Sequence, residues 1–166
     1  MTLILGIDPG LVHTGWGIID STGSALRFIA CGAIHPDKNA PLATRLCTLH
    51  DELVKVIALH RPDEAAVEET FATQNGSSTL KLGQARGALI LTLATTGLAV
   101  YEYAATLVKK SVVGVGRAEK EQVTMMVRQL LPSATLRTPD EADALAVAIC
   151  HAGHATMRRT LAKATQ

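Results

Sequence analysis

Short apolar runs separated by turn residues occupy the first part of the chain. Residues 3–7 form one such run, typical of a buried strand, and Asp-Pro-Gly at positions 8–10 ends it with turn chemistry. Residues 15–20 and 26–34 follow as two more strands, joined by a hairpin turn at Thr22-Gly23. Three consecutive strands predict an antiparallel meander.

Helical spacing then replaces the short runs. Leucine or isoleucine recurs every three or four residues at 42, 46, 49, 53 and 57, which predicts a helix over 41–60 that Arg61-Pro62 stops. Further along, the pattern predicts strands over 64–71 and 98–103. It predicts helices over 77–96, up to about 111, over 118–131, and from 138 onward.

The last helix has a strong start signal. Thr138 is suited to the N-cap, Pro139 to the first helical position, and Glu141 completes a capping box. The order of elements, βββαβαβ followed by helices, predicts an α/β fold in which helices lie on both faces of a mixed five-stranded sheet.

Composition is consistent with one folded domain. The 166 residues are 48% hydrophobic and 19% charged, which excludes a disordered chain, and only 3% aromatic, so the core must be mostly aliphatic. Cys31, Cys47 and Cys150 form no CxxC pair, which argues against a zinc site or a disulfide framework and for reduced thiols. The N-terminus has no basic leader and the most apolar run, 88–100, is shorter than the ~20 residues of a membrane span. We therefore expect a cytoplasmic protein.

Charge is unevenly distributed although the net charge is only +1. Residues 1–80 carry a net −4, residues 81–128 a net +4, and residues 129–166 a net +1. An acidic segment beside a basic one suits a metal site that faces a phosphate backbone, although such imbalances also arise on ordinary solvated surfaces.

Carboxylates stand at the ends of two predicted strands. Asp8 closes the first strand, where burial of its charge needs a compensating cation, unless Asp8 serves only to form the turn. Glu68 and Glu69 close the fourth strand and point to opposite faces, and periodicity alone does not decide which face carries a site. Both could equally be solvated glutamates.

Two more acids share one face of the last helix. Asp140 and Asp143 are three residues apart; Asp140 is also favoured there by the helix dipole alone, whereas Asp143 is surrounded by apolar residues. Converging carboxylates repel one another, and magnesium relieves that repulsion with oxygen ligands. Two such metals can support phosphodiester hydrolysis. His13 is a weak further candidate, and His151 and His154 are interpreted as surface or core histidines rather than ligands.

Several motifs together resemble one known family. They are Gly-Ile-Asp-Pro-Gly at 6–10 with Thr-Gly-Trp-Gly at 14–17, Ala-Val-Glu-Glu-Thr-Phe at 66–71, Lys-Leu-Gly-Gln-Ala-Arg-Gly at 81–87, the stretch 101–120, and Asp-Glu-Ala-Asp-Ala-Leu-Ala at 140–146. In this order, the motifs resemble RuvC-type Holliday junction resolvases over nearly the whole chain.

The resemblance implies an RNase H-like fold and paired, symmetric nicking of four-way DNA junctions in recombination and repair. It assigns catalysis and metal binding to Asp8, Glu68, Asp140 and Asp143, with two Mg²⁺ ions per site for which Mn²⁺ can substitute. It thereby selects Glu68 over Glu69.

The resemblance also implies partners. It suggests a homodimer, a branch-migration motor complex of the RuvA–RuvB type, and no nucleotide cofactor. DNA contacts are expected at Phe71, Lys81, Arg86, Lys109 and Lys120; the alternative is solvated charge for the lysines and core packing for Phe71.

Two rival functions remain at this stage. The motif at 6–10 also resembles the phosphate loop of actin-like ATPases, but those folds need two lobes and 166 residues leave no room for both. A non-catalytic junction-binding module is the other rival, and it would not need the four acids. We expect a nuclease domain over 1–157 and a flexible C-terminal tail over 158–166.

Overall fold

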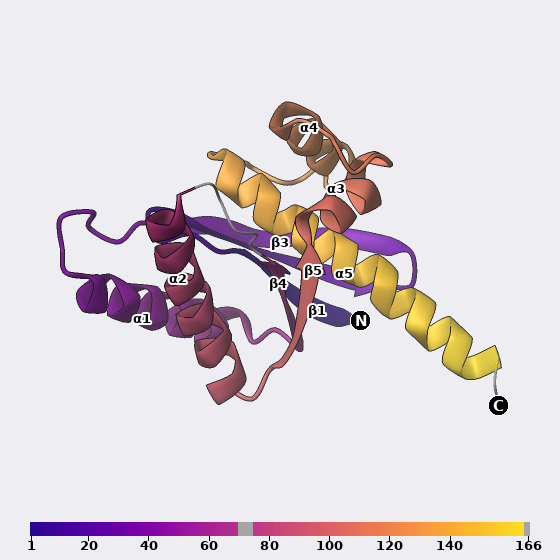
Figure 1. Cartoon of the computed structure of the whole chain (residues 1–166). Coiled ribbons are helices and arrows are strands. Elements are labelled where there is room, and N and C mark those ends of the chain that lie inside the picture. The colour runs from indigo at the N-terminus through magenta and orange to yellow at the C-terminus, as the bar shows by residue number, and fades with distance from the viewer. Residues whose placement is uncertain (70–74, 165–166) are drawn as a thin grey trace.

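The structure, a computed structural model, describes residues 1–69 and 75–164. Five strands and five helices follow one another along these residues (Figure 1). The strands are β1 (Thr2–Asp8), β2 (Thr14–Thr22), β3 (Ala25–Ile34), β4 (Glu64–Glu69) and β5 (Ala99–Ala104). The helices are α1 (Leu42–His60), α2 (Gly76–Thr95), α3 (Ala105–Val113), α4 (Lys120–Leu130) and α5 (Pro139–Ala164).

The strands form one mixed sheet in the order β3-β2-β1-β4-β5. The first three are antiparallel neighbours, which confirms the predicted meander. Strand β4 joins β1 in parallel and β5 joins β4 in parallel. Parallel β1 and β4 bring their carboxyl ends to the same edge of the sheet, which is where the acids predicted from the sequence stand.

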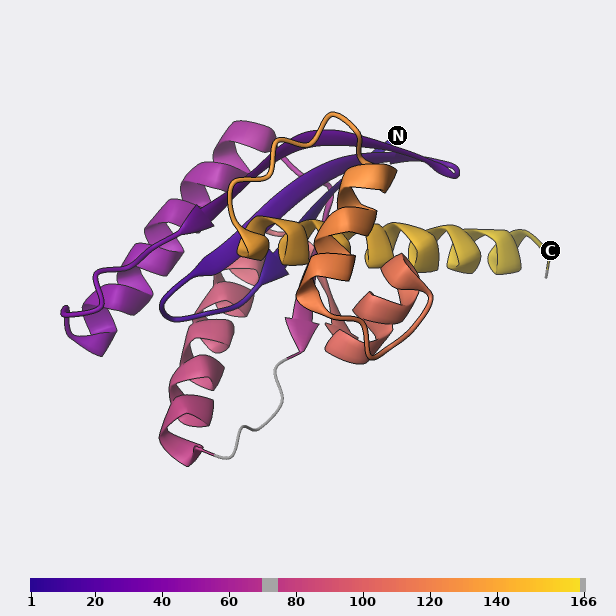
Figure 2. The same cartoon turned by 90° about the horizontal axis from the view of Figure 1, so that it is seen from above.

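Helices cover both faces of the sheet, as the sequence predicts (Figures 1 and 2). On one face α1 and α2 enclose an aliphatic core that includes Leu49, Leu53 and Leu89. On the other face α5 crosses the sheet, and α3 and α4 pack beside it around a second core that includes Val127 and Leu145. Because α5 has sheet on one side and helices on the other, its residues 144–150 are apolar all round.

The start of α5 has the predicted capping box. The backbone N–H of Glu141 donates to the Thr138 hydroxyl at 3.4 Å, and the Glu141 carboxylate accepts from the N–H of Thr138 at 3.2 Å. This exchange fixes where the helix begins, and therefore where its first acids lie. The helix continues past residue 157 to Ala164, while the predicted domain boundary at 157 stays a prediction.

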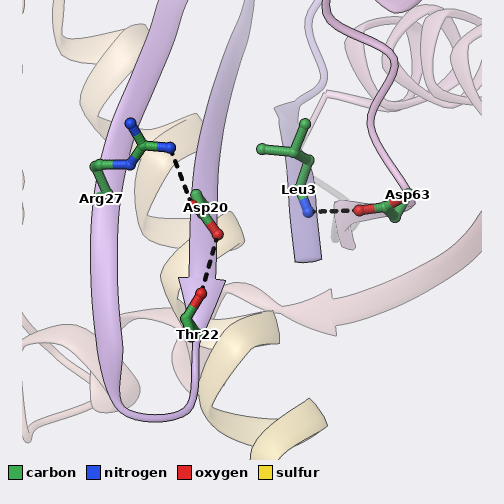
Figure 3. A network of polar contacts seen from close by, with 5 residues as sticks. All are labelled: Leu3, Asp20, Thr22, Arg27 and Asp63. Carbon is green, nitrogen blue, oxygen red and sulfur yellow. Dashed lines mark hydrogen bonds and ion pairs between the residues drawn. The ribbon is translucent and has the colours of Figure 1, made fainter. Parts of the chain in front are cut away.

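Polar groups near the other end of the sheet are paired with one another. Figure 3 shows Arg27 of β3 turned toward Asp20 of β2, at 3.1 Å, and the backbone N–H of Leu3 donating to Asp63 at 2.7 Å. His151 is buried between the hydroxyl of Tyr103 and the carboxylate of Glu64, so its interpretation as a core histidine is confirmed. No helix in the described ranges is long and apolar enough to cross a bilayer.

Candidate active site

The pleat of β1 directs Asp8 toward α5. Ile7 packs into the core under α1 and α2, whereas Gly6 faces α5 closely enough that an added Cβ would meet the backbone of Ala144 and Ala148. Asp8 lies two residues beyond Gly6 and so shares its face. The carboxylate therefore sits at the carboxyl end of a central strand, next to the first turns of α5.

The same argument separates the two glutamates of β4. Ala66 belongs to the core on the α5 side and Val67 to the core on the opposite side. Glu68 continues the face of Ala66, and Glu69 that of Val67. Strand β4 thus presents Glu68 beside Asp8, because Ile7 and Val67 are paired in the parallel ladder.

Helix α5 supplies the remaining acids. One carboxylate oxygen from each of Asp8, Asp140 and Asp143 can lie within 4.8 Å of the others, and all three residues are partly buried. Glu68 is not part of this tight group among the described residues, but its charge interacts with both Asp8 and Asp143. We call these four residues the acid cluster.

Burial, with mutual repulsion, raises the pKa of three of the acids, Asp8, Glu68 and Asp143. Burial is the larger cause and the charge of Glu68 the next, and together they raise the pKa of Asp8 to about 8. Burial and then the charge of Asp143 raise the pKa of Glu68 to about 7. Burial also raises the pKa of Asp143. Carboxylates that are costly to ionise side by side would be stabilised by a bound cation. Because they offer oxygen ligands, a hard divalent ion such as Mg²⁺ fits them.

Two lysines face the cluster. The Lys120 ammonium, at the start of α4, lies 3.3 Å from a carboxylate oxygen of Asp143, and the charge of Asp143 raises the pKa of Lys120. Lys109 of α3 acts from further away, where its charge lowers the pKa of Glu68. Lys109 and Lys120, two of the three lysines that the resemblance assigned to DNA, thus act on the acid cluster through their charges.

The other predicted contact residues are more dispersed. Lys81 is exposed on the first turns of α2. Arg86 forms an ion pair with Glu102, and its Nε donates to the backbone carbonyl of Glu68 at 3.3 Å, so it also steadies the end of β4. Phe71 lies outside the described residues. His13 packs against His35, with 2.6 Å between their Nδ1 atoms, and is not part of the acid cluster in the described chain.

Reasoning from residue types missed what holds the loop after Asp8. The buried hydroxyl of Thr14 donates to the carbonyl of Gly10 at 2.5 Å and accepts from its N–H at 3.2 Å, which closes the loop. Arg45 of α1 donates to the carbonyl of Leu11 at 2.7 Å and ties the loop to α1. A threonine four residues after a glycine in a strand-to-strand connection is a signal that could have been used.

The arrangement is that of an acidic, cation-binding site built on strand ends and a helix start, flanked by lysines, in a mixed α/β sheet. Comparison with known proteins agrees with it. Residues 4–151 match the model of the family "Crossover junction endodeoxyribonuclease RuvC". The chain is 62% identical to the RuvC protein of Paramagnetospirillum magneticum over 161 residues, 97% of each chain, and 59% identical to that of Azorhizobium caulinodans over 162 residues, 96% of each.

A solved structure shows the same fold. The Thermus thermophilus RuvC structure in complex with Holliday junction substrate superposes with a TM-score of 0.87 at 33% identity, covering 95% of this chain and 96% of that one. The fold and the acid cluster therefore define an RNase H-like nuclease. The chain belongs to the RuvC family of crossover junction endodeoxyribonucleases.

Proposed function

We propose that this protein resolves four-way DNA junctions by paired, symmetric hydrolysis of phosphodiester bonds in recombination and DNA repair in the cytoplasm. One observation carries the proposal: in a chain of the RuvC family, carboxylates from β1 and α5 converge within 4.8 Å at the carboxyl edge of the sheet. The relative from T. thermophilus, bound to a Holliday junction, supports the substrate class.

The activity is proposed to depend on magnesium, with manganese able to substitute. Asp8, Asp140 and Asp143 would hold the metal, with Glu68 completing the set. Bound there, a pair of divalent ions would activate water and stabilise the leaving oxygen. The donor set fits because it offers only carboxylate oxygens, which hard cations prefer.

The chain's own side chains supply the rest of the proposed chemistry. Lys109 and Lys120 stand where a phosphate approaching the cluster would pass, and each offers an ammonium to a phosphate oxygen. Lys81 and Arg86 on α2, and Phe71, are proposed as further DNA contacts. Partial burial of the acids excludes much of the solvent and strengthens the field of each charge on the substrate.

A twofold homodimer would supply the second active site. One acid cluster cuts one strand, whereas resolution needs two nicks on opposed strands of a nearly twofold substrate. Helix α2 is the proposed contact: Gly83 and Gly87 are both exposed, and a Cβ added at either would meet no atom of the described residues within 4 Å beyond the helix's own backbone. Two glycines in one helix could also reflect close packing on the chain's own sheet, but the open space at both positions contradicts that explanation. Leu80 and Leu91, each 64% exposed, lie on the same helix.

A branch-migration motor of the RuvA–RuvB type is the proposed further partner, and no nucleotide cofactor is expected. The decisive experiment is cleavage of a synthetic four-way junction with Mg²⁺ or with EDTA. We expect Asp8→Asn, Glu68→Gln and Asp143→Asn each to abolish cleavage while junction binding is retained. Near-normal cleavage by Asp8→Asn at saturating magnesium would overturn the assignment, and metal-independent binding without any cleavage would favour a binding module.

A further inference from the structure

The sheet has an open edge at β3. In the described part of the chain, β3 pairs with β2 alone. An unpaired edge presents backbone N–H and C=O groups that can pair with a further strand, and proteins usually protect such edges with charges, proline or a covering segment.

Charge and proline do not protect this edge. The stretch from Phe28 to Ile34 contains neither a charged residue nor a proline. The only charged residue of β3 is Arg27, which precedes this stretch, is 67% exposed and pairs with Asp20 of β2 (Figure 3). From Ala30 to Ile34 the pairing with β2 runs in register without a shift, so the outer side of this stretch is a regular strand edge.

A groove of about 530 Å³ lies along this edge. Residues of β3 line one wall, and Thr135, Arg137 and Thr138, in the connection from α4 to α5, line the other together with Glu141. Figure 2 shows this connection passing β3 on its way to α5. We call it the edge groove. Because it has a second wall, it admits one extended chain more readily than the edge of another sheet with its covering helices.

The charges at the edge groove indicate what it would bind. The Glu141 carboxylate is already engaged by the backbone N–H groups of Arg137 and Thr138, at 2.5 and 3.2 Å, and by the thiol of Cys31. The Arg137 side chain is exposed at the groove and makes no ion pair among the described residues. Glu141 is only 5% exposed, so the charge exposed to an incoming chain at the groove is the positive one of Arg137.

We propose that the edge groove is a docking site for an extended, acid-containing segment of a partner protein, which adds to β3 as a sixth strand. Main-chain hydrogen bonds to the strand edge supply affinity, and Arg137 selects an acidic side chain. Thr138 and Glu141 line the groove at the start of α5, and between them in the sequence stands Asp140 of the acid cluster. A partner held here would therefore sit directly beside the acid cluster.

The test uses the full-length protein and a synthetic probe, an acetylated heptapeptide of alternating threonine and valine with glutamate at its centre. Binding is followed by NMR shifts of backbone amides and by amide exchange. We expect shifts confined to β3 and residues 135–138, and slower exchange at alternate residues of β3. The same peptide with N-methyl groups on alternate amides should not bind, because it cannot complete the ladder.

Charge variants test the choice of occupant. Arg137→Gln should weaken binding of the glutamate peptide about five-fold, the size expected for one exposed ion pair, while Arg128→Gln on the exposed face of α4 serves as the matched control. A peptide with lysine in place of glutamate should bind less tightly to the unaltered protein. The proposal would be overturned if the N-methylated peptide bound equally well, or if no peptide bound at millimolar concentration. It would also be overturned if protection of β3 grew with protein concentration, because that would indicate a second copy as the occupant.

Discussion

Removal of one buried carboxylate should stabilise this protein when metal is absent. Asp8 has a pKa of about 8 in the folded chain and 3.8 as the unperturbed reference. When the pH lies between 3.8 and about 8, the Asp8 carboxyl keeps its proton in the folded state but has lost it in the unfolded state. Stability therefore falls as pH rises, by about 1.4 kcal/mol per pH unit, and the full cost to the metal-free protein is about 5 kcal/mol at pH 8. Below about pH 4 the cost disappears.

Asp8→Asn removes the ionisable group without changing the side-chain volume. We expect the variant to match the unaltered protein near pH 4 and to exceed it increasingly toward pH 8, in urea unfolding with EDTA present. Saturating Mg²⁺ should stabilise the unaltered protein far more than the variant, because only the former has the complete set of acids. Asp51→Asn, an exposed position on α1, is the matched control and should change little.

Two results would refute this reasoning. One is a difference between Asp8→Asn and the unaltered protein that does not vary with pH. The other is an equal stabilisation of both by magnesium. Either result would mean that Asp8 is solvated in the folded chain and that repulsion among the acids does not destabilise the metal-free protein.

Three further outcomes follow from the structure. Lys109→Ala and Lys120→Ala should each flatten the log–log salt dependence of junction binding by about one unit, measured by salt titration, and unchanged slopes would remove them from the interface. Thr138→Ala should cost about 1 kcal/mol of stability in urea unfolding through loss of the N-cap, and a loss below experimental error would show that the cap is replaceable. Sedimentation equilibrium at micromolar concentration should give twice the chain mass of 17.5 kDa, and Gly87→Arg should reduce it, unless α2 is not the interface.

Local patterns were sufficient to predict most elements. The leucine spacing in α1 defines its buried face because three residues of that pattern, Leu49, Leu53 and Ile57, reach the core. The capping residues of α5 were predictable because N-cap chemistry depends on only four consecutive positions. The strand expected over 64–71 is present as β4 up to Glu69, and residues 70–74 lie outside the described residues.

Long-range relations were harder to predict. Alternation shows that Glu68 and Glu69 point to opposite faces, but which face meets α5 depends on how β4 sits beside β1. The order of strands is likewise a property of the whole sheet. The edge groove has no local signature, since its walls are separated by about a hundred residues of sequence and meet only after α5 has packed.

The glycines of β1 and β2 explain why the acids meet. An added Cβ at Gly6 would overlap the backbone of Ala144 and Ala148, and one at Gly15 would overlap the carbonyl of Asp140. Helix α5 therefore approaches the sheet at backbone distance, which is closer than any side chain allows. This approach brings the first turn of α5, with its acids, to the end of β1, where Asp8 stands. In the sequence nothing marks these two glycines within their apolar strands. In the fold they set the spacing of the acid cluster, because a methyl group at either would push α5 away from the sheet.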